Sequence, residues 1–214
     1  MKNNTKYMII LIGALSLITL SALALSGSQD NIKITSTPLQ DNAKPVNNDM
    51  PLYCESSASL VPLNDTELSN NSDTIVVGIV KKILPSKWNT ADGKRPGNTD
   101  DAFSPSCLIY TDIIISVDEY LKNPLSSKEV KVRVEGGTVG NDTLIASYEP
   151  SLESGEKVLL YLMKDDNPGT KDIDPDHFRV TGFIQGKYTL TDDGKATRPG
   201  KNTTLDELSS TIKE

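Results

Sequence analysis

The chain has 214 residues, with 22 Lys and Arg against 29 Asp and Glu, and its formal net charge is -7. Basic residues are adjacent only at Lys81–Lys82 and Lys94–Arg95, and neither pair lies among aromatic residues. Because a surface that follows phosphates needs clustered Lys and Arg, this composition excludes nucleic acid as a partner.

The first 25 residues predict export across a membrane. Lys2 and Lys6 precede an uncharged, apolar run over residues 8–25 that carries small residues near its end, as secretory signals do. The run is longer than the usual core of a signal peptide and shorter than the roughly 20 residues of a spanning helix. Residues 1–25 are therefore either a cleaved signal peptide or a hydrophobic helix that anchors the chain. The preceding lysines predict that the rest of the chain is extracytoplasmic, secreted or anchored to the cell membrane.

Residues 26–51 are expected to form a flexible polar tether, and residues 52–214 a single folded domain. The tether is rich in Ser, Asn, Asp, Thr and Pro and cannot bury enough apolar surface to offset the entropy of ordering. The remaining length suits one hydrophobic core and is too short for two.

Runs of β-branched residues in the domain predict a mainly β fold. Residues 74–84, 108–121 and 157–163 have apolar centres, as in strands that are buried on both faces or curl around a barrel. The single Gly78 in the first run predicts a bend in that strand.

Two further strand segments are expected at residues 178–184 and 186–198. The second contains Asp193–Gly194, which predicts a hairpin because glycine accepts the positive φ of the turn. Residues 203–214 predict a short C-terminal helix with Thr203 or Thr204 as its N-cap. One face of this helix is apolar, with Leu205, Leu208 and Ile212.

Residues 129–135 alternate strictly between apolar and charged side chains. This pattern predicts a half-buried strand whose three valines face the core and whose Lys131 and Arg133 face solvent. The strand is followed by Gly136–Gly137 and a third glycine, as in some phosphate-binding loops. No helix opens after these glycines and no lysine follows them, so we interpret them as a corner of the barrel.

Two long polar segments, residues 87–106 and 164–176, interrupt the strands, and loops of this length are usually functional or disordered. The second is rich in aspartate, with three residues at i, i+2 and i+4 as in the first half of a calcium loop. The glycine and the bidentate glutamate of an EF-hand are missing. A looser calcium site is the weak prediction, against a solvated acidic loop, and its ligands would be Asp165, Asp166, Asp172, Asp174 and Asp176.

The residues and motifs that common enzyme mechanisms need are missing, and we therefore predict that the protein is not an enzyme. His177 is the only histidine, it has no partners at metal-binding spacing, and the chain has no GxSxG nucleophile motif. We expect His177 to be a solvated loop residue. Carboxylates are too abundant to mark a hydrolase site, although Glu135 and Glu156 at strand ends are a candidate pair.

Cys54 and Cys107 are too far apart in sequence for a CxxC redox or metal motif. Outside the cytoplasm they are expected to form one disulfide, and two separate buried thiols are the alternative. Possible glycan acceptors in Asn-x-Ser/Thr motifs are Asn64, Asn70, Asn141 and Asn202.

Five segments together resemble an uncharacterised group of archaeal and bacterial envelope proteins. They are "DTIVVGIV", "TDIIISVDEYLKN", "EVKVRVEGGTVG", "PSLESGEKVLLYLM" and "FRVTGFIQGKYTL", between Asp73 and Leu190. The pattern is also distantly similar to the OB-type barrels of netrin and tissue-inhibitor domains. That resemblance implies a small closed barrel that binds protein or polysaccharide through exposed loops, and it assigns no activity.

The expected molecule is an OB-like β-barrel with a short C-terminal helix, preceded by the N-terminal hydrophobic helix. We expect a non-catalytic binding or envelope-structural module whose partner is a surface protein or polysaccharide, and we expect no cofactor other than calcium, should the weakly predicted site bind it. Trp88 and Tyr110 mark a weakly predicted binding face, with a tryptophan that closes the barrel end as the alternative. The competing classes are a secreted carboxylate-based hydrolase and a calcium-dependent adhesion module.

Overall fold

The computed structural model describes residues 50–97, 102–103 and 107–213. The hydrophobic segment expected over residues 1–25, and the tether expected over residues 26–51 apart from its last two residues, lie outside the described residues. Among the helices of the described part, none combines the length and the apolar character needed to cross a membrane.

Five strands close into a β-barrel, which confirms the expectation of a mainly β fold. They are β2 Thr74–Ile83, β4 Ile109–Lys122, β5 Glu129–Glu135, β8 Lys157–Lys164 and β9 Phe178–Val180. The order around the barrel is β2, β4, β5, β9 and β8, and β8 pairs again with β2. All of these pairings are antiparallel except that of β5 with β9, which is parallel. The third barrel strand therefore pairs with the fifth, and the fourth pairs with the first.

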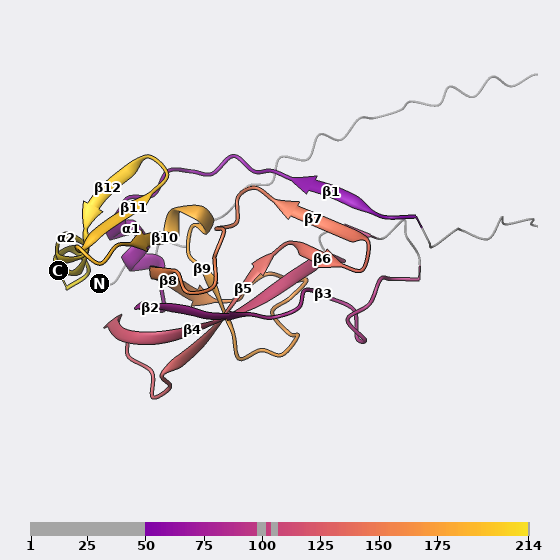
Figure 1. Ribbon diagram of the computed structural model, residues 1–214, viewed down its shortest axis with the longest axis horizontal. Helices are drawn as coiled ribbons and strands as arrows, with labels where there is room; N and C mark the ends of the chain where they lie inside the picture. The colour runs from indigo at the N-terminus through magenta and orange to yellow at the C-terminus, as the bar shows by residue number, and fades with distance from the viewer. Residues whose placement is uncertain (1–49, 98–101, 104–106, 214) are drawn as a thin grey trace, which may run out of the picture. The chain divides into compact units, whose positions relative to one another are not determined.

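Shorter elements surround the barrel (Figure 1). The strands are β1 Tyr53–Ser56, β3 Lys87–Trp88, β6 Gly137–Val139, β7 Asp142–Ala146, β10 Lys187–Leu190, β11 Lys195–Arg198 and β12 Lys201–Thr204. The helices are α1 Asp65–Asn71, α2 Leu205–Lys213 and the 3-10 helix η2 Phe183–Gly186. Strands β1, β7 and β6 form a separate sheet, in which β1 runs parallel to β7. Strands β10 to β12 extend the barrel sheet beyond β8, and α1 and α2 lie together beside them.

The first half of β2 and most of β8 are buried on both faces, which explains their continuously apolar sequences. Alternate residues of each strand belong to two different hydrophobic clusters. One cluster joins residues from all five barrel strands and fills the barrel with aliphatic side chains. The other packs the opposite faces of β2 and β8 against α1, α2, β10 and β11. The barrel interior is therefore a packed core.

Gly78 marks an irregularity in the first barrel strand. The register of β2 against β4 shifts between Val77 and Gly78. A Cβ atom at position 78 would lie 2.2 Å from the carbonyl oxygen of Ser116, so no larger residue fits without movement of the backbone. The register shift at this glycine is consistent with the predicted bend.

The C-terminal elements follow the sequence prediction with one exception. The hairpin at Asp193–Gly194 joins β10 to β11, and Gly194 has a φ of 81°. The hydroxyl of Thr204 accepts the N–H of Glu207 at 3.2 Å, so Thr204 is the N-cap of α2. The strand expected over residues 178–184 is wrong in its second half, because the chain turns into η2 after β9.

Helix α1 was not predicted, although the sequence around its start contains the residues of a capping box. The Asn64 side chain accepts the N–H of Glu67, and the Glu67 carboxylate accepts the N–H of Asn64, both at 2.9 Å. This capping box satisfies two helix-end donors and fixes the start of the helix.

Gly136–Gly137 form the corner where the chain leaves β5 and enters β6. Their φ values are 113° and 131°, which side chains rarely allow. A Cβ atom on Gly137 would also lie 2.1 Å from the Ser86 Oγ and 2.6 Å from the Thr111 Oγ1. The two glycines do form a sharp corner, but there the chain leaves the barrel for the separate sheet of β1, β7 and β6. The following segment is the β6–β7 hairpin, not a helix that could bind phosphate.

A buried carboxylate, Asp65, ties α1 to the C-terminal strands. Its Oδ1 accepts the Tyr188 hydroxyl at 2.7 Å and lies 3.3 Å from the Arg198 Nη2, and its Oδ2 pairs with Lys201. Asp65 is only 5% exposed. Burial and the hydrogen bond to Asp65 raise the pKa of Tyr188, which keeps this hydroxyl protonated as a donor.

Cys54 and Cys107 both pack in a third hydrophobic cluster, together with Trp88, Leu108 and Leu144. Cys54 is a half-buried thiol on β1, and Cys107 is buried just before β4. Both are free thiols in the structure, as in the alternative, and they share one hydrophobic cluster, so the disulfide between them stays a prediction.

We expect Asp65→Asn to lower the free energy of unfolding by about 3 kcal/mol, because the change leaves Arg198, whose side chain is only 8% exposed, without its counter-ion. Denaturant-induced unfolding of both proteins measures the difference. Asp118→Asn, on an exposed position of β4, is the control and should change stability by less than about 0.5 kcal/mol. Equal effects of the two substitutions would contradict the role of Asp65.

We expect the chain, when purified without reductant, to yield a peptide in which Cys54 is linked to Cys107. Reduction should then lower the free energy of unfolding by about 4 kcal/mol, because the disulfide restricts the unfolded chain. Peptide mass analysis with and without reductant, followed by denaturant unfolding, tests both statements. Alkylation of both thiols in the unreduced protein would show that the disulfide is absent.

Candidate functional site

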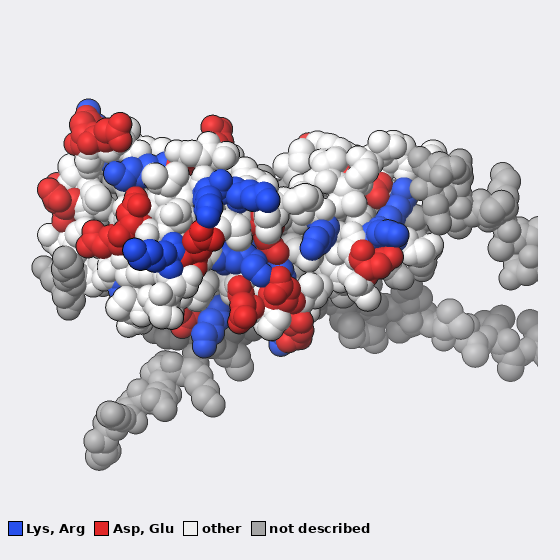
Figure 2. Space-filling view, turned by 60° about the horizontal axis from the view of Figure 1, so that its bottom comes forward, with Lys and Arg blue, Asp and Glu red and all other residues white. Residues whose placement is uncertain are grey.

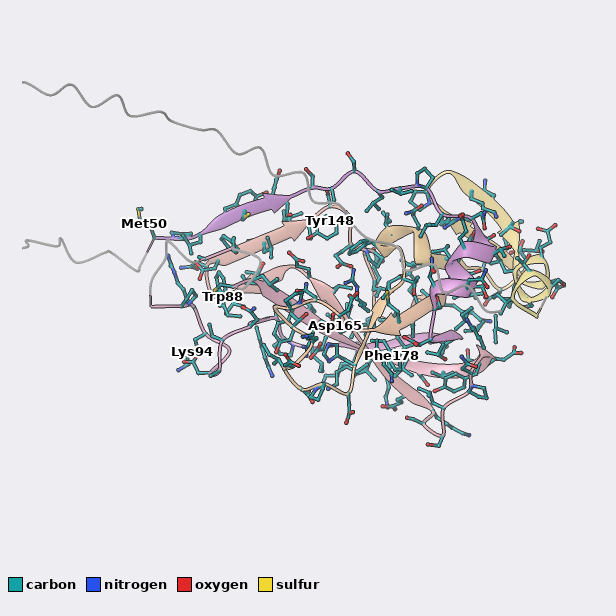
Figure 3. The ribbon with its side chains drawn as sticks, turned by 180° about the vertical axis from the view of Figure 1, so that it is seen from behind. Met50, Trp88, Lys94, Tyr148, Asp165 and Phe178 are labelled. Carbon is teal, nitrogen blue, oxygen red and sulfur yellow. The ribbon has the colours of Figure 1, made fainter. Side chains whose placement is uncertain are left out.

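A pocket of about 550 Å³ opens beside the barrel, where β4, β5 and β9 meet the loop of residues 165–177. Segments just after β1 and after β7 close its other side. Figure 3 shows Tyr148, beyond the end of β7, and Asp165, beyond the end of β8, in the central part of the described residues. The wall combines aromatic rings, carboxyl groups and guanidinium groups, chiefly Tyr110, Arg133, Glu135, Tyr148, Glu149 and Arg179.

The guanidinium group of Arg133 joins the barrel to the loop above it. Its Nε and Nη2 donate to the two carboxylate oxygens of Asp112, at 2.7 and 2.9 Å. Its Nη1 donates to the carbonyl oxygens of Thr170 and Ile173 in the loop, at 3.0 and 2.7 Å. Arg133 is 3% exposed. The expectation that Arg133 faces solvent is therefore wrong, because this loop covers the outer face of β5.

Asp165 and His177 hold the two ends of the same loop together. The Nε2 of His177 lies 2.7 Å from the Oδ2 of Asp165, and its Nδ1 lies 2.8 Å from the carbonyl oxygen of Asp174. Burial raises the pKa of Asp165, but hydrogen bonds from His177, Thr170 and the Asn167 N–H outweigh it and lower the pKa to about 2. His177 is 4% exposed, so its prediction as a solvated loop residue is wrong.

Glu135 and Glu149 are half-buried carboxyl groups in the pocket wall. Burial raises the pKa of Glu149 to about 7, against the opposing effects of the Glu135 N–H and the Arg179 charge, and the Glu135 and Asp165 carboxylates add to the rise. Burial also raises the pKa of Glu135, while the Tyr148 hydroxyl and Arg179 act in the opposite direction. A carboxyl group whose pKa is close to 7 can keep its proton at neutral pH, or lose it and bind a positively charged ligand.

Arg179, on β9, lines the pocket, but its guanidinium group already has an ion-pair partner and an aromatic contact. Its Nη1 donates to the Oδ1 of Asp166 at 2.6 Å. Its Cζ lies 4.7 Å from the centroid of the Phe183 ring, and that ring meets Tyr148 edge-on at 5.2 Å. Arg179 therefore modulates the nearby glutamates through its charge without forming an ion pair with either of them.

Charges of both signs mix over the surface that Figure 2 shows. On this face, the Lys and Arg side chains lie among Asp and Glu side chains, with no large patch of one sign. Such a surface gives little long-range attraction to a highly charged polymer.

The five aspartates proposed as calcium ligands do not form one ligand set. Asp165 binds His177, Asp166 pairs with Arg179, and Asp174 pairs with Lys131. Asp172 and Asp176 are exposed. Among the described residues no group of three or more His, Cys, Asp or Glu is placed to hold a metal ion. A calcium site built from all five therefore has no support in the described residues, because three of the carboxylates pair with His177, Arg179 and Lys131, which the sequence spacing did not show.

Trp88 and Tyr110, the predicted binding face, are both buried. Trp88 is 0% exposed and its ring lies tilted against that of Phe103, with a centroid distance of 5.0 Å, so its indole is not accessible to a partner. Tyr110 is 4% exposed, because the Arg133 guanidinium lies 4.0 Å above its ring centroid. Tyr110 lines the pocket. Trp88, the second residue of β3, packs in a cluster with Cys107, Leu108 and Leu144 that is separate from the barrel core, so the alternative that it closes the barrel end stays a prediction.

Other sequence candidates lie apart from the pocket. Glu156 pairs with Lys187 and accepts the Thr189 hydroxyl, both at 2.6 Å, so it does not face Glu135 as a second acid. The acid beside Glu135 is Glu149. The four asparagines proposed as glycan acceptors are all exposed; they are Asn64, Asn70, Asn141 and Asn202. Glycosylation at these residues therefore stays a prediction.

Sequence reasoning missed Tyr148, Glu149 and Arg179 as pocket residues. The "SYEP" stretch contains the first two, but no motif or spacing relates it to β5 or β9. Only the return of the chain from β7 past the end of β5 brings these groups together. A comparison with models of known protein families gives no match, and a comparison with curated proteins gives none either.

We expect the stability of the protein to fall as the pH rises from 5 to 8, in part because of Glu149. Its pKa in the folded state, about 7, exceeds the ordinary value of 4.5, so its contribution is complete below pH 4.5 and is lost as the pH rises through 7. The difference in unfolding free energy between wild type and Glu149→Gln should change by about 2 kcal/mol over this range. Denaturant unfolding at both pH values measures it, with Glu119→Gln on the exposed part of β4 as the control. A pH-independent difference would refute the raised pKa.

Proposed function

We propose that residues 52–214 form an OB-type barrel that acts outside the membrane as a non-catalytic binding module. The strand order supports the fold assignment, because five strands close with the third beside the fifth and the fourth beside the first. The long loops follow the first and fourth barrel strands. In OB folds these two loops and the face of strands two and three bind the ligand.

The position of the pocket is the observation that carries this proposal. Strands two and three of the barrel are β4 and β5, and the loop after the fourth strand is residues 165–177. The pocket lies where these parts meet. The barrel itself is filled by aliphatic side chains, so a ligand has access to this outer surface and not to the interior. Pockets of this size hold small ligands or single side chains of larger partners.

The location outside the membrane is supported by the sequence of residues 1–25 and by the acidic composition. A partner at that location is a surface protein or a polysaccharide. The pocket supports either one, because it offers aromatic rings, hydroxyl groups and charged groups of both signs.

The test uses the 214-residue chain, immobilised as wild type, Glu135→Gln or Glu119→Gln, and incubated with solubilised polysaccharide and protein fractions of the cell envelope. We expect wild type and Glu119→Gln to retain a component that Glu135→Gln retains at least about tenfold less well, because Glu135 lines the pocket and Glu119 does not. Equal retention by all three proteins would place binding elsewhere. No retention by any of them would count against a binding module.

A carboxylate-based hydrolase is the second candidate, and the Glu135–Glu149 pair is the observation that favours it. A carboxyl group with a pKa of about 7 beside a second carboxyl group is the arrangement that glycoside hydrolases use for acid and base. Turnover of chromogenic glycosides by wild type, lost in both Glu135→Gln and Glu149→Gln, would establish this function in place of the first. The absence of turnover across a broad panel supports the binding module.

A further inference from the structure

The pocket wall holds two carboxyl groups without ion-pair partners among the described residues. Neither Glu135 nor Glu149 has a Lys, Arg or His nitrogen within 4.0 Å, whereas the other acids of the wall, Asp165 and Asp166, are paired with His177 and Arg179. The two glutamates come from different segments, the end of β5 and the chain after β7. Half-buried carboxylates that lack a counter-ion are costly in free energy.

The cations of the pocket are already neutralised by other groups. Arg133 forms a two-pronged ion pair with Asp112. Arg179 pairs with Asp166 and lies over the Phe183 ring. Four carboxyl groups and two guanidinium groups line the pocket, so its wall carries an excess of negative charge. An anionic ligand would meet repulsion there, and a positive ligand would meet attraction.

The remaining contacts suit the apolar part of an organic cation. Tyr148 and Phe183 place aromatic surface beside the glutamates. The Tyr148 hydroxyl interacts with Ser56 and Glu135, and burial raises its pKa to about 12, so it remains a donor at neutral pH. Among the described residues no group of three or more His, Cys, Asp or Glu is placed to hold a metal ion, which favours an organic cation over a metal ion as the partner of the two glutamates.

We propose that this pocket binds an alkylammonium or guanidinium group, with Glu135 and Glu149 as its two counter-ions. The inference rests on the proposed binding function and narrows its ligand. The group belongs either to a free amine or to a Lys or Arg side chain of a surface protein. In both cases the positive charge supplies what the two glutamates lack, and the aromatic rings contact the carbon chain next to it.

The experiment titrates the 214-residue chain by calorimetry at pH 8 with N-acetyl-lysine methylamide, N-acetyl-arginine methylamide and spermidine. The neutral controls are the norleucine and citrulline analogues, which keep the shape of the side chain without its charge. We expect at least one cation to bind and the neutral analogues to bind at least about tenfold more weakly. Binding of spermidine alone identifies a free amine as the ligand, and binding of the capped amino acids identifies a side chain.

The variants locate the binding. Glu135→Gln and Glu149→Gln should each weaken cation binding at least about tenfold, and Glu119→Gln should leave it unchanged. A thermal melt of each variant confirms that it is folded, and either glutamate suffices if the other variant is unstable. Equal binding of charged and neutral probes, or no binding of any cation at millimolar concentration, overturns the inference. If an envelope component is still retained through Glu135 in that case, the binding function stands with a neutral ligand; if retention is also absent, both proposals fail.

Discussion

The buried guanidinium group of Arg133 is the interaction on which the pocket depends. Four hydrogen bonds from this one group reach Asp112 on the neighbouring strand and the carbonyl oxygens of Thr170 and Ile173 in the loop, and its flat face covers Tyr110. A buried arginine is tolerated only when its charge is paired and its donors are used. Because the donors are divided between barrel and loop, the free energy that satisfies the arginine also fixes the loop in place.

The location of the two unpaired glutamates follows from this attachment. Side chains two residues apart on a strand point to the same face, so Glu135 lies on the face of β5 that Arg133 occupies. The loop satisfies Arg133 but provides no cation for Glu135, and its own Asp166 takes Arg179. The chain after β7 then adds Glu149 from the other side. The pocket is therefore negative because the cations around it are used for structural pairs.

The sequence predicts the barrel strands well because burial on one or both faces leaves a pattern within each strand. The alternation of β5 predicts its valine face, and the Thr204 cap predicts α2. The same alternation misplaces Arg133, because a loop from another part of the chain covers its outer face. Asp165 and His177 are misread for the same reason: their environment comes from contacts across the loop. The sequence of a strand predicts which of its faces is apolar. What covers the polar face depends on other parts of the chain, and only the folded structure shows it.

The two candidate functions make opposite demands on the same pair of carboxyl groups. A cation bound between Glu135 and Glu149 favours their ionised forms and so lowers both pKa values. A general acid must keep its proton near neutral pH, and the pKa of about 7 allows this for Glu149. A site occupied by a cation has therefore lost the proton that hydrolysis requires. A single pocket of this composition can serve binding or acid catalysis at a given pH, and the excess of negative charge in its wall favours the bound cation.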